Sequence, residues 1–225
     1  MLQDETTAMK PRRSHPANSP RPIFEAELFR RDSELLHIVD NWLVRANQRG
    51  GEHIACRPGC AQCCMGAFAI DRLDAVRLQR GLGELAERDL PRAQRILQRA
   101  ADSLERIAEF FPGNIETGIL DSTPGAAEIF EDFANDEPCP ALDPETLTCD
   151  LYAHRPMTCR VFGPPVCSEG GLGVCELCFT GAGPEEIAAA EVPLEGSEQE
   201  LALNFELERA IGCGETIVAF ALLGK

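Results

Sequence analysis

The chain has 225 residues, 44% of them hydrophobic, with one Trp and one Tyr, so it can form one domain with a core that is poor in large aromatic side chains. Its net charge is −16, and the acidic excess lies in residues 101–225, which carry five basic and twenty-four acidic side chains. A surface this acidic repels phosphate backbones and argues against binding to nucleic acid.

The sequence predicts a chain that stays in the cytoplasm and does not enter a membrane. No apolar run reaches about 18 residues, the length needed for a spanning helix. The first residues are polar and acidic, without the basic and then apolar layout of a secretory signal. Thiols stay reduced in the cytoplasm, and the odd number of cysteines, eleven, comes in close groups. This pattern favours metal binding over a disulfide framework.

The N-terminal part is predicted to be a disordered tail followed by a helix. Residues 1–22 hold four prolines among Ser, Asn and Arg, so we expect disorder there and a single cysteine-cluster metal-binding domain over residues 23–225. A helix is expected from Ile23 to about Gln48 and should end at Gly50-Gly51. We expect it to pack as a lid beside the first cysteines. Its apolar stripe comprises Phe24, Leu28, Leu35, Val39 and Trp42.

Two further helices are expected after the first cysteine loop. Residues 67–70 read as a short extended piece, and Asp71 as the N-cap of a helix that Gly81 and Gly83 interrupt. A second helix should begin near Pro91 and stop at Pro112-Gly113. The arginines between residues 72 and 106 lie mostly off the apolar stripes, so they are predicted to be solvated.

The second half is predicted to be loop-rich in its centre and helical at its end. Residues 113–137 are expected to form a long, irregular acidic insert with one helical turn. Residues 139–178 have too little apolar area to order themselves, and we expect metal to hold them. Residues 184–225 return to a helical pattern, with a last helix or strand over 216–223. The predicted fold class is mainly α, with helices around a loop-rich, cysteine-ligated metal centre.

Ten cysteines form two dense groups and are the candidate metal ligands. The spacings of Cys60 to Cys63 and of Cys175 to Cys178 let the backbone turn once around an ion. Because adjacent side chains usually point apart, Cys63 and Cys64 imply a wide site, two sites or one spare thiol. We expect Cys213, the eleventh cysteine, to be a buried small hydrophobe. The ten are Cys56, Cys60, Cys63 and Cys64 in the first group and Cys139, Cys149, Cys159, Cys167, Cys175 and Cys178 in the second.

The cysteine pattern resembles the YkgJ-type cysteine-cluster family, a zinc- or iron-chelating domain. The resemblance rests on C-x3-C-x2-C-C from Cys56 to Cys64, on C-P-A-L at Cys139, and on C-D-L-Y-A-H-R-P-M-T-C-R-V-F-G from Cys149. A related domain occurs in flagellin lysine-N-methylases, where it is thought to hold an iron–sulfur cluster, and some members are labelled iron–sulfur oxidoreductases. The acidic insert and three later cysteines depart from the simplest members. The resemblance implies a chelating set of Cys56, Cys60, Cys63, Cys64, Cys139, Cys149 and Cys159.

Four basic side chains lie near these cysteines in the sequence. Arg155 and Arg160 would either offset thiolate charge or pair with carboxylates, and the residues favour neither. His154 and His53 could ligate metal or support a ligand, although ordinary surface positions are more common.

The sequence predicts a cofactor but does not assign a reaction or catalytic residue. We expect an iron–sulfur cluster, because the thiols outnumber one zinc site, with zinc as the alternative. The corresponding functions are a redox or protein-modifying enzyme acting on a protein substrate, a structural zinc module that recruits a protein partner, and a thiol redox or metal sensor.

Overall fold

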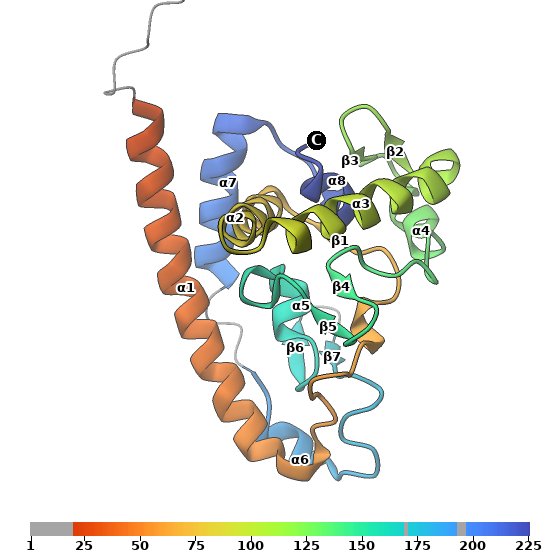
Figure 1. Ribbon diagram of the computed structural model, residues 1–225. Coiled ribbons are helices and arrows are strands. Elements are labelled where there is room, and N and C mark those ends of the chain that lie inside the picture. The colour runs from red at the N-terminus through yellow and green to blue at the C-terminus, as the bar shows by residue number, and fades with distance from the viewer. Residues whose placement is uncertain (1–19, 169–170, 193–196) are drawn as a thin grey trace, which may run out of the picture.

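The computed structural model describes residues 20–168, 171–192 and 197–225 and shows a mainly α-helical chain, which confirms the predicted fold class (Figure 1). Residues 1–19, most of the predicted tail, lie outside these ranges. None of the described helices is long and apolar enough to cross a membrane. The helices are α1 (Pro20–Gly50), α2 (Arg72–Arg88), α3 (Leu90–Ile107), α4 (Ala126–Glu131), α5 (Met157–Val161), α6 (Pro184–Ala189), α7 (Ser197–Ile211) and α8 (Val218–Leu222).

Short antiparallel strand pairs and 3₁₀ turns connect the helices. The pairs within the described ranges are β1 (Ala69–Ile70) with β8 (Thr216–Ile217), β2 (Gly113–Asn114) with β3 (Ile119–Leu120), β4 (Leu142–Asp143) with β5 (Thr148–Cys149), and β6 (Val166–Ser168) with β7 (Gly171–Gly173). The 3₁₀ turns are Gly51–His53, Gln62–Cys64, Ala108–Phe110 and Tyr152–His154. The segment predicted as a last helix or strand contains both, since β8 leads directly into α8.

Two helix packings form most of the core. Helices α2, α3 and α8 pack together through buried residues that include Leu78, Ile96 and Val218. Helix α1 runs along one side of the molecule and packs on α7 (Figure 1). Leu28, Leu35 and Val39 of its predicted stripe are buried there, whereas the side chain of Phe24 lies outside the described residues.

The helix boundaries follow the predicted capping residues. Asp71 caps α2, because its Oδ1 accepts a hydrogen bond from the Asp74 amide at 2.8 Å. Asp89 caps α3 in the same way, and Pro91 lies in the first turn of that helix, where its missing N–H costs nothing. Helix α1 begins at Pro20, three residues earlier than predicted, and ends at Gly50.

The prediction that glycines interrupt the second helix is wrong, because α2 continues through Gly81 and Gly83. Gly81 is buried where the 3₁₀ turn at Tyr152–His154 crosses the helix. A Cβ built on Gly81 would lie 2.5 Å from the Cβ of His154, whereas one on Gly83 would meet no atom within 4 Å. Gly81 is therefore there for close packing rather than for flexibility.

We expect the two glycines to respond oppositely to alanine. Gly83→Ala should raise the free energy of unfolding by about 0.5–1 kcal/mol, because alanine has the better helix propensity. Gly81→Ala should lower it by roughly 1–3 kcal/mol through the overlap with His154. Urea unfolding followed by circular dichroism measures both. Equal stabilisation by the two substitutions would contradict the close packing at Gly81.

The prediction that the helix arginines are solvated is also wrong at Arg77, which is 3% exposed. Its guanidinium binds Asp32 on α1 at 2.5 Å, Asp74 on its own helix at 2.6 Å and Glu200 on α7 at 2.8 Å. One cation thus joins three helices. Burial raises the pKa of the Glu200 carboxyl to about 7. The neighbouring carboxylate of Asp74 adds to this rise, and Arg77 opposes it.

The raised pKa predicts a pH-dependent cost at Glu200. Between its ordinary pKa of 4.5 and its raised pKa of about 7, the Glu200 carboxyl keeps its proton in the folded chain but has released it in the unfolded chain. The contribution of Glu200 to the free energy of unfolding therefore falls as the pH rises towards 7. Glu200→Gln removes this cost. The unfolding free energy of the variant minus that of the wild type should rise by roughly 1–3 kcal/mol between about pH 5 and about pH 8.

Glu206→Gln is the matched control, since Glu206 lies on the same helix and pairs with Arg31 at a half-exposed position. Its difference from the wild type should be nearly independent of pH. A flat difference for Glu200→Gln as well would contradict the raised pKa.

Candidate metal centre

Three separate segments carry the seven cysteines that the family resemblance implies. Cys56 and Cys60 lie in the loop after α1, and Cys63 and Cys64 lie in the 3₁₀ turn at residues 62–64. Cys139 lies three residues before the start of β4, Cys149 ends β5, and Cys159 is the central residue of α5.

Backbone hydrogen bonds join the first of these segments to the second. The Cys139 amide donates to the carbonyl oxygen of Cys64 at 2.8 Å, and the Gly66 amide donates to that of Glu137 at 2.9 Å. In the β4–β5 pair Cys149 lies opposite Leu142, which is three residues after Cys139. Residues about 75 positions apart in sequence are thereby placed side by side.

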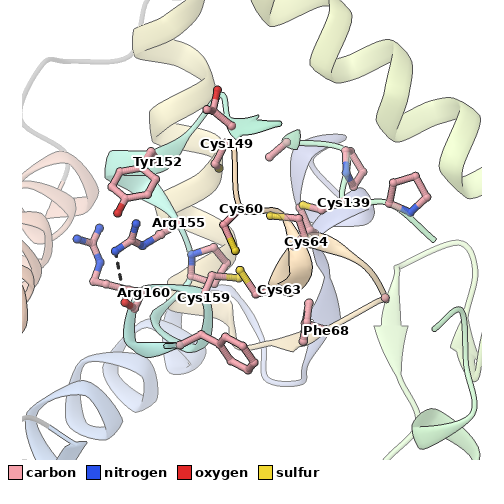
Figure 2. Close-up of a pocket in the computed structure, with 18 of the residues that line it drawn as sticks. Cys60, Cys63, Cys64, Phe68, Cys139, Cys149, Tyr152, Arg155, Cys159 and Arg160 are labelled. Atoms are coloured by element: carbon pink, nitrogen blue, oxygen red, sulfur yellow. Dashed lines mark hydrogen bonds between the residues drawn. The ribbon is translucent and has the colours of Figure 1, made fainter. Parts of the chain in front are cut away.

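All seven of these cysteines line one cavity of about 500 Å³ (Figure 2). The C-terminal half of α1 also borders it through Leu43 and Asn47, as expected for a helix beside the first cysteines. The lining cysteines are Cys56, Cys60, Cys63, Cys64, Cys139, Cys149 and Cys159.

The other four cysteines lie outside this cavity. Cys175 and Cys178 are buried elsewhere, and Cys167 is exposed on β6, so its role as a ligand stays a prediction. The prediction that Cys213 is buried is wrong. It lies beyond the end of α7 between Gly212 and Gly214, whose φ angles of 98° and 119° turn the chain outward, and its side chain is exposed.

The cavity thiols influence one another's protonation. Burial, together with the neighbouring thiols, raises the pKa values of Cys139, to about 12, of Cys149 and of Cys159. A hydrogen bond from Cys64 lowers the pKa of Cys63 to about 6, and the same contact raises the pKa of Cys64. The thiols therefore resist losing their protons together unless a cation lies among them.

Backbone N–H groups in the cavity wall favour the thiolate form of two cysteines. Nearby backbone N–H groups, those of Ala141 and Leu142 at Cys139 and that of Leu151 at Cys149, oppose the rise in the pKa values of these thiols. Such donors stabilise the anionic form of sulfur and orient metal ligands.

The two arginines considered from the sequence, Arg155 and Arg160, have different roles. Arg155 stacks on Tyr152, 3.8 Å from the ring centroid (Figure 2). Its charge helps to lower the pKa of Cys63 and opposes the rise in the pKa of Cys149. Arg160 is buried and pairs with Asp40 of α1 at 2.5 Å. Of these two arginines, it is therefore Arg155 that offsets thiolate charge.

Neither histidine lines the cavity. His154 lies 3.1 Å from a carboxylate oxygen of Glu84, and His53 lies 3.3 Å from one of Glu186. Both histidines support the fold around the cysteine segments.

Helix α3 positions two of the cysteines, a role that the sequence analysis missed. Asp150, directly after Cys149, is 1% exposed in its side chain and pairs with Arg92 at 2.6 Å and Arg99 at 2.5 Å. Arg99 also donates to the carbonyl oxygen of Pro140, directly after Cys139, at 2.8 Å. The only available signal was that a charged or turn residue follows each of these cysteines.

The donor set fits a metal, although the thiols do not yet surround a single point. Within residues 20–168, 171–192 and 197–225, no three Cys, His, Asp or Glu side chains have the closed arrangement of a bound ion. Ligation therefore requires side-chain rotation. Several free thiols, backbone N–H groups near sulfur and a nearby guanidinium are the environment that zinc and iron–sulfur clusters use.

The fold and the site together define a mainly α-helical protein with a cysteine-lined metal cavity. Residues 55–168, about half of the chain, match a family model described as "CxxCxxCC: Putative zinc- or iron-chelating domain", and the chain belongs to this family. The match ends before Cys175. No curated protein and no solved structure matches the chain.

Removing Asp150 should disturb the cavity from outside. Asp150→Ala leaves Arg92 and Arg99 without their shared partner, so we expect the free energy of unfolding to fall by about 1–3 kcal/mol and metal retention to fall with it. Arg106→Ala, in the exposed pair with Glu137, is the control and should change stability by less than about 1 kcal/mol. Unaltered metal content and stability in Asp150→Ala would contradict the positioning role.

Proposed function

We propose that the central cavity holds an iron–sulfur cluster and that the chain is a cytoplasmic redox or protein-modifying protein. The observation that carries this proposal is the cavity itself, since cysteines from three segments line a space of about 500 Å³. Such a cluster, when bound, supplies one-electron redox chemistry. Metal chelation by cysteines is the property that the family description gives; iron–sulfur chemistry and the reaction are the proposed part.

The size of the space favours a cluster over a lone zinc ion. Four thiolates around zinc have sulfur atoms only about 3.8 Å apart, because each Zn–S bond is about 2.3 Å and the geometry is tetrahedral. In that compact arrangement the zinc ion alone occupies the space between the sulfur atoms. A cluster has a larger body and takes thiolates from separate loops. Three of the cavity cysteines, Cys63, Cys139 and Cys149, each help to raise the pKa values of both Cys64 and Cys159.

The chain's own residues would tune the site in two ways. Arg155 and the backbone N–H groups near Cys139 and Cys149 stabilise negative charge on sulfur, whereas burial of these thiols disfavours it. The balance of the two sets how readily the site accepts an electron.

The cavity rim suits contact with a protein partner or protein substrate. Leu147, Tyr152 and Phe162 line the cavity and are also exposed, at 44%, 65% and 42% of their surface. Exposed apolar side chains next to a functional site commonly mark a contact surface. This rim supports a site that acts on, or with, another protein.

Anaerobic purification followed by a visible spectrum and by iron, sulfide and zinc analysis tests the proposal. We expect a coloured protein with about two to four iron atoms per chain and matching sulfide. Cys139→Ser and Cys159→Ser should lose most of the colour, because both residues line the cavity. Cys213→Ser is the control and should keep it. A colourless wild-type protein with zinc alone would contradict the iron–sulfur assignment.

A thiol sensor is the second candidate function, and the Cys63–Cys64 pair is the observation that favours it. Cys63 has a lowered pKa beside a thiol that holds its proton, which is the arrangement of a reactive thiolate with a neighbouring resolving thiol. An iron-free chain from the anaerobic preparation would favour this candidate or a structural zinc module that recruits a partner.

A further inference from the structure

A second group of thiols lies outside the family match. Cys175 and Cys178 are buried, each 4% exposed, and lie beyond residue 168, where the match ends. The sulfur of Cys178 is 4.0 Å from the sulfur of Cys56. Cys60 follows Cys56 by four residues and Cys175 precedes Cys178 by three, so this contact brings two pairs of thiols together.

Backbone contacts join the two loops that carry these thiols. The Phe179 amide donates to the carbonyl oxygen of His53 at 2.8 Å, and the two rings stack with centroids 5.6 Å apart. The Cys175 amide donates to the carbonyl oxygen of Gly163 at 3.3 Å. A Cβ on Gly163 would lie 2.8 Å from the sulfur of Cys56, so this glycine allows the loops to meet.

Hydrogen bonds close the turn at Cys175–Cys178 and reach one of its sulfurs. The Cys178 amide donates to the carbonyl oxygen of Cys175 at 2.8 Å. The Ala55 amide donates to the sulfur of Cys178 at 3.3 Å, and Phe179 then turns the chain away with a φ of 56°. Donors of this kind stabilise thiolates and orient them as metal ligands.

Distance and spacing favour a bound ion over a disulfide. The 4.0 Å between the sulfurs of Cys56 and Cys178 is about twice a disulfide bond, and close to the separation of about 3.8 Å between thiolates on a tetrahedral zinc ion. The intervals in Cys56-x3-Cys60 and Cys175-x2-Cys178 are both within the usual range for zinc loops.

We propose that Cys56, Cys60, Cys175 and Cys178 form a second metal site that binds a structural zinc ion. The ion joins the loop after α1 to the segment before α6, at the end of the molecule where α1 and α6 meet (Figure 1). This segment, residues 174–183, has no regular secondary structure, so a crosslink supplies the order that its few apolar contacts do not. The site leaves five cysteines for the central cavity.

Zinc analysis of cysteine variants tests this site separately from the central one. The wild type should contain about one equivalent of zinc in addition to any metal in the cavity. The double variant Cys175→Ser/Cys178→Ser should lose that equivalent and keep the iron and the visible spectrum. Cys60→Ser should lose zinc in the same way. Cys167→Ser is the matched control and should keep both.

A histidine variant distinguishes loss of a zinc ligand from misfolding of the serine variants. Cys56 is exposed, so Cys56→His has room and still offers a zinc ligand, whereas Cys56→Ser does not. We expect Cys56→His to retain zinc and thermal stability and Cys56→Ser to lose both.

The outcomes separate this proposal from the central iron–sulfur assignment. Two equivalents of zinc and no iron in the wild type, with one equivalent lost on removing Cys175 and Cys178, would support the second site and contradict the cluster. No zinc in the wild type, zinc unchanged in the double variant, or a disulfide among these four cysteines after isolation under argon would overturn the second site.

Discussion

Charged side chains on the helices fasten the cysteine segments, and the geometry of the metal centre depends on these contacts. The segments have little apolar area of their own, so they cannot order themselves by burial. Arg99 of α3 binds Asp150 and the carbonyl oxygen of Pro140, next to Cys149 and Cys139. These half-buried hydrogen bonds are charge-assisted and specific in direction, and they fix where the neighbouring thiols lie.

The same arrangement recurs on the other side of the cavity. Asp74 of α2 pairs with Arg77 and accepts a hydrogen bond at 2.9 Å from the amide of Met157, the first residue of the helix that carries Cys159. Arg160 of that helix reaches across to Asp40 of α1. Breaking the pair between Arg160 and Asp40 would leave the buried guanidinium without its carboxylate partner, which is costly. These contacts therefore place the segments that carry the thiols around the cavity.

The sequence could predict a feature when the residues that determine it are close together in the chain, and could not when they lie in distant segments. The apolar stripe of α1 and the N-cap at Asp71 are local patterns, and both predictions were right. Gly81 and Arg77 were misjudged, because their roles depend on a turn seventy residues away and on carboxylates from two other helices. The cysteines were recognisable by their density, but the contact of Cys178 with Cys56, which are in different groups of the sequence, was not. It arises from the return of residues 174–179 to the loop after α1, which no spacing encodes.

The division of the thiols gives the two groups different expected roles. The central cysteines line an open space with an exposed apolar rim, which suits a cofactor that exchanges electrons or contacts a partner. The four at Cys56, Cys60, Cys175 and Cys178 join two loops and suit a closed structural ion. X-ray absorption at the iron edge of the anaerobically purified protein tests the central assignment most directly. We expect an all-sulfur first coordination shell with an additional iron–iron shell, whereas an iron site with only nitrogen and oxygen neighbours, or no bound iron, would contradict the iron–sulfur assignment.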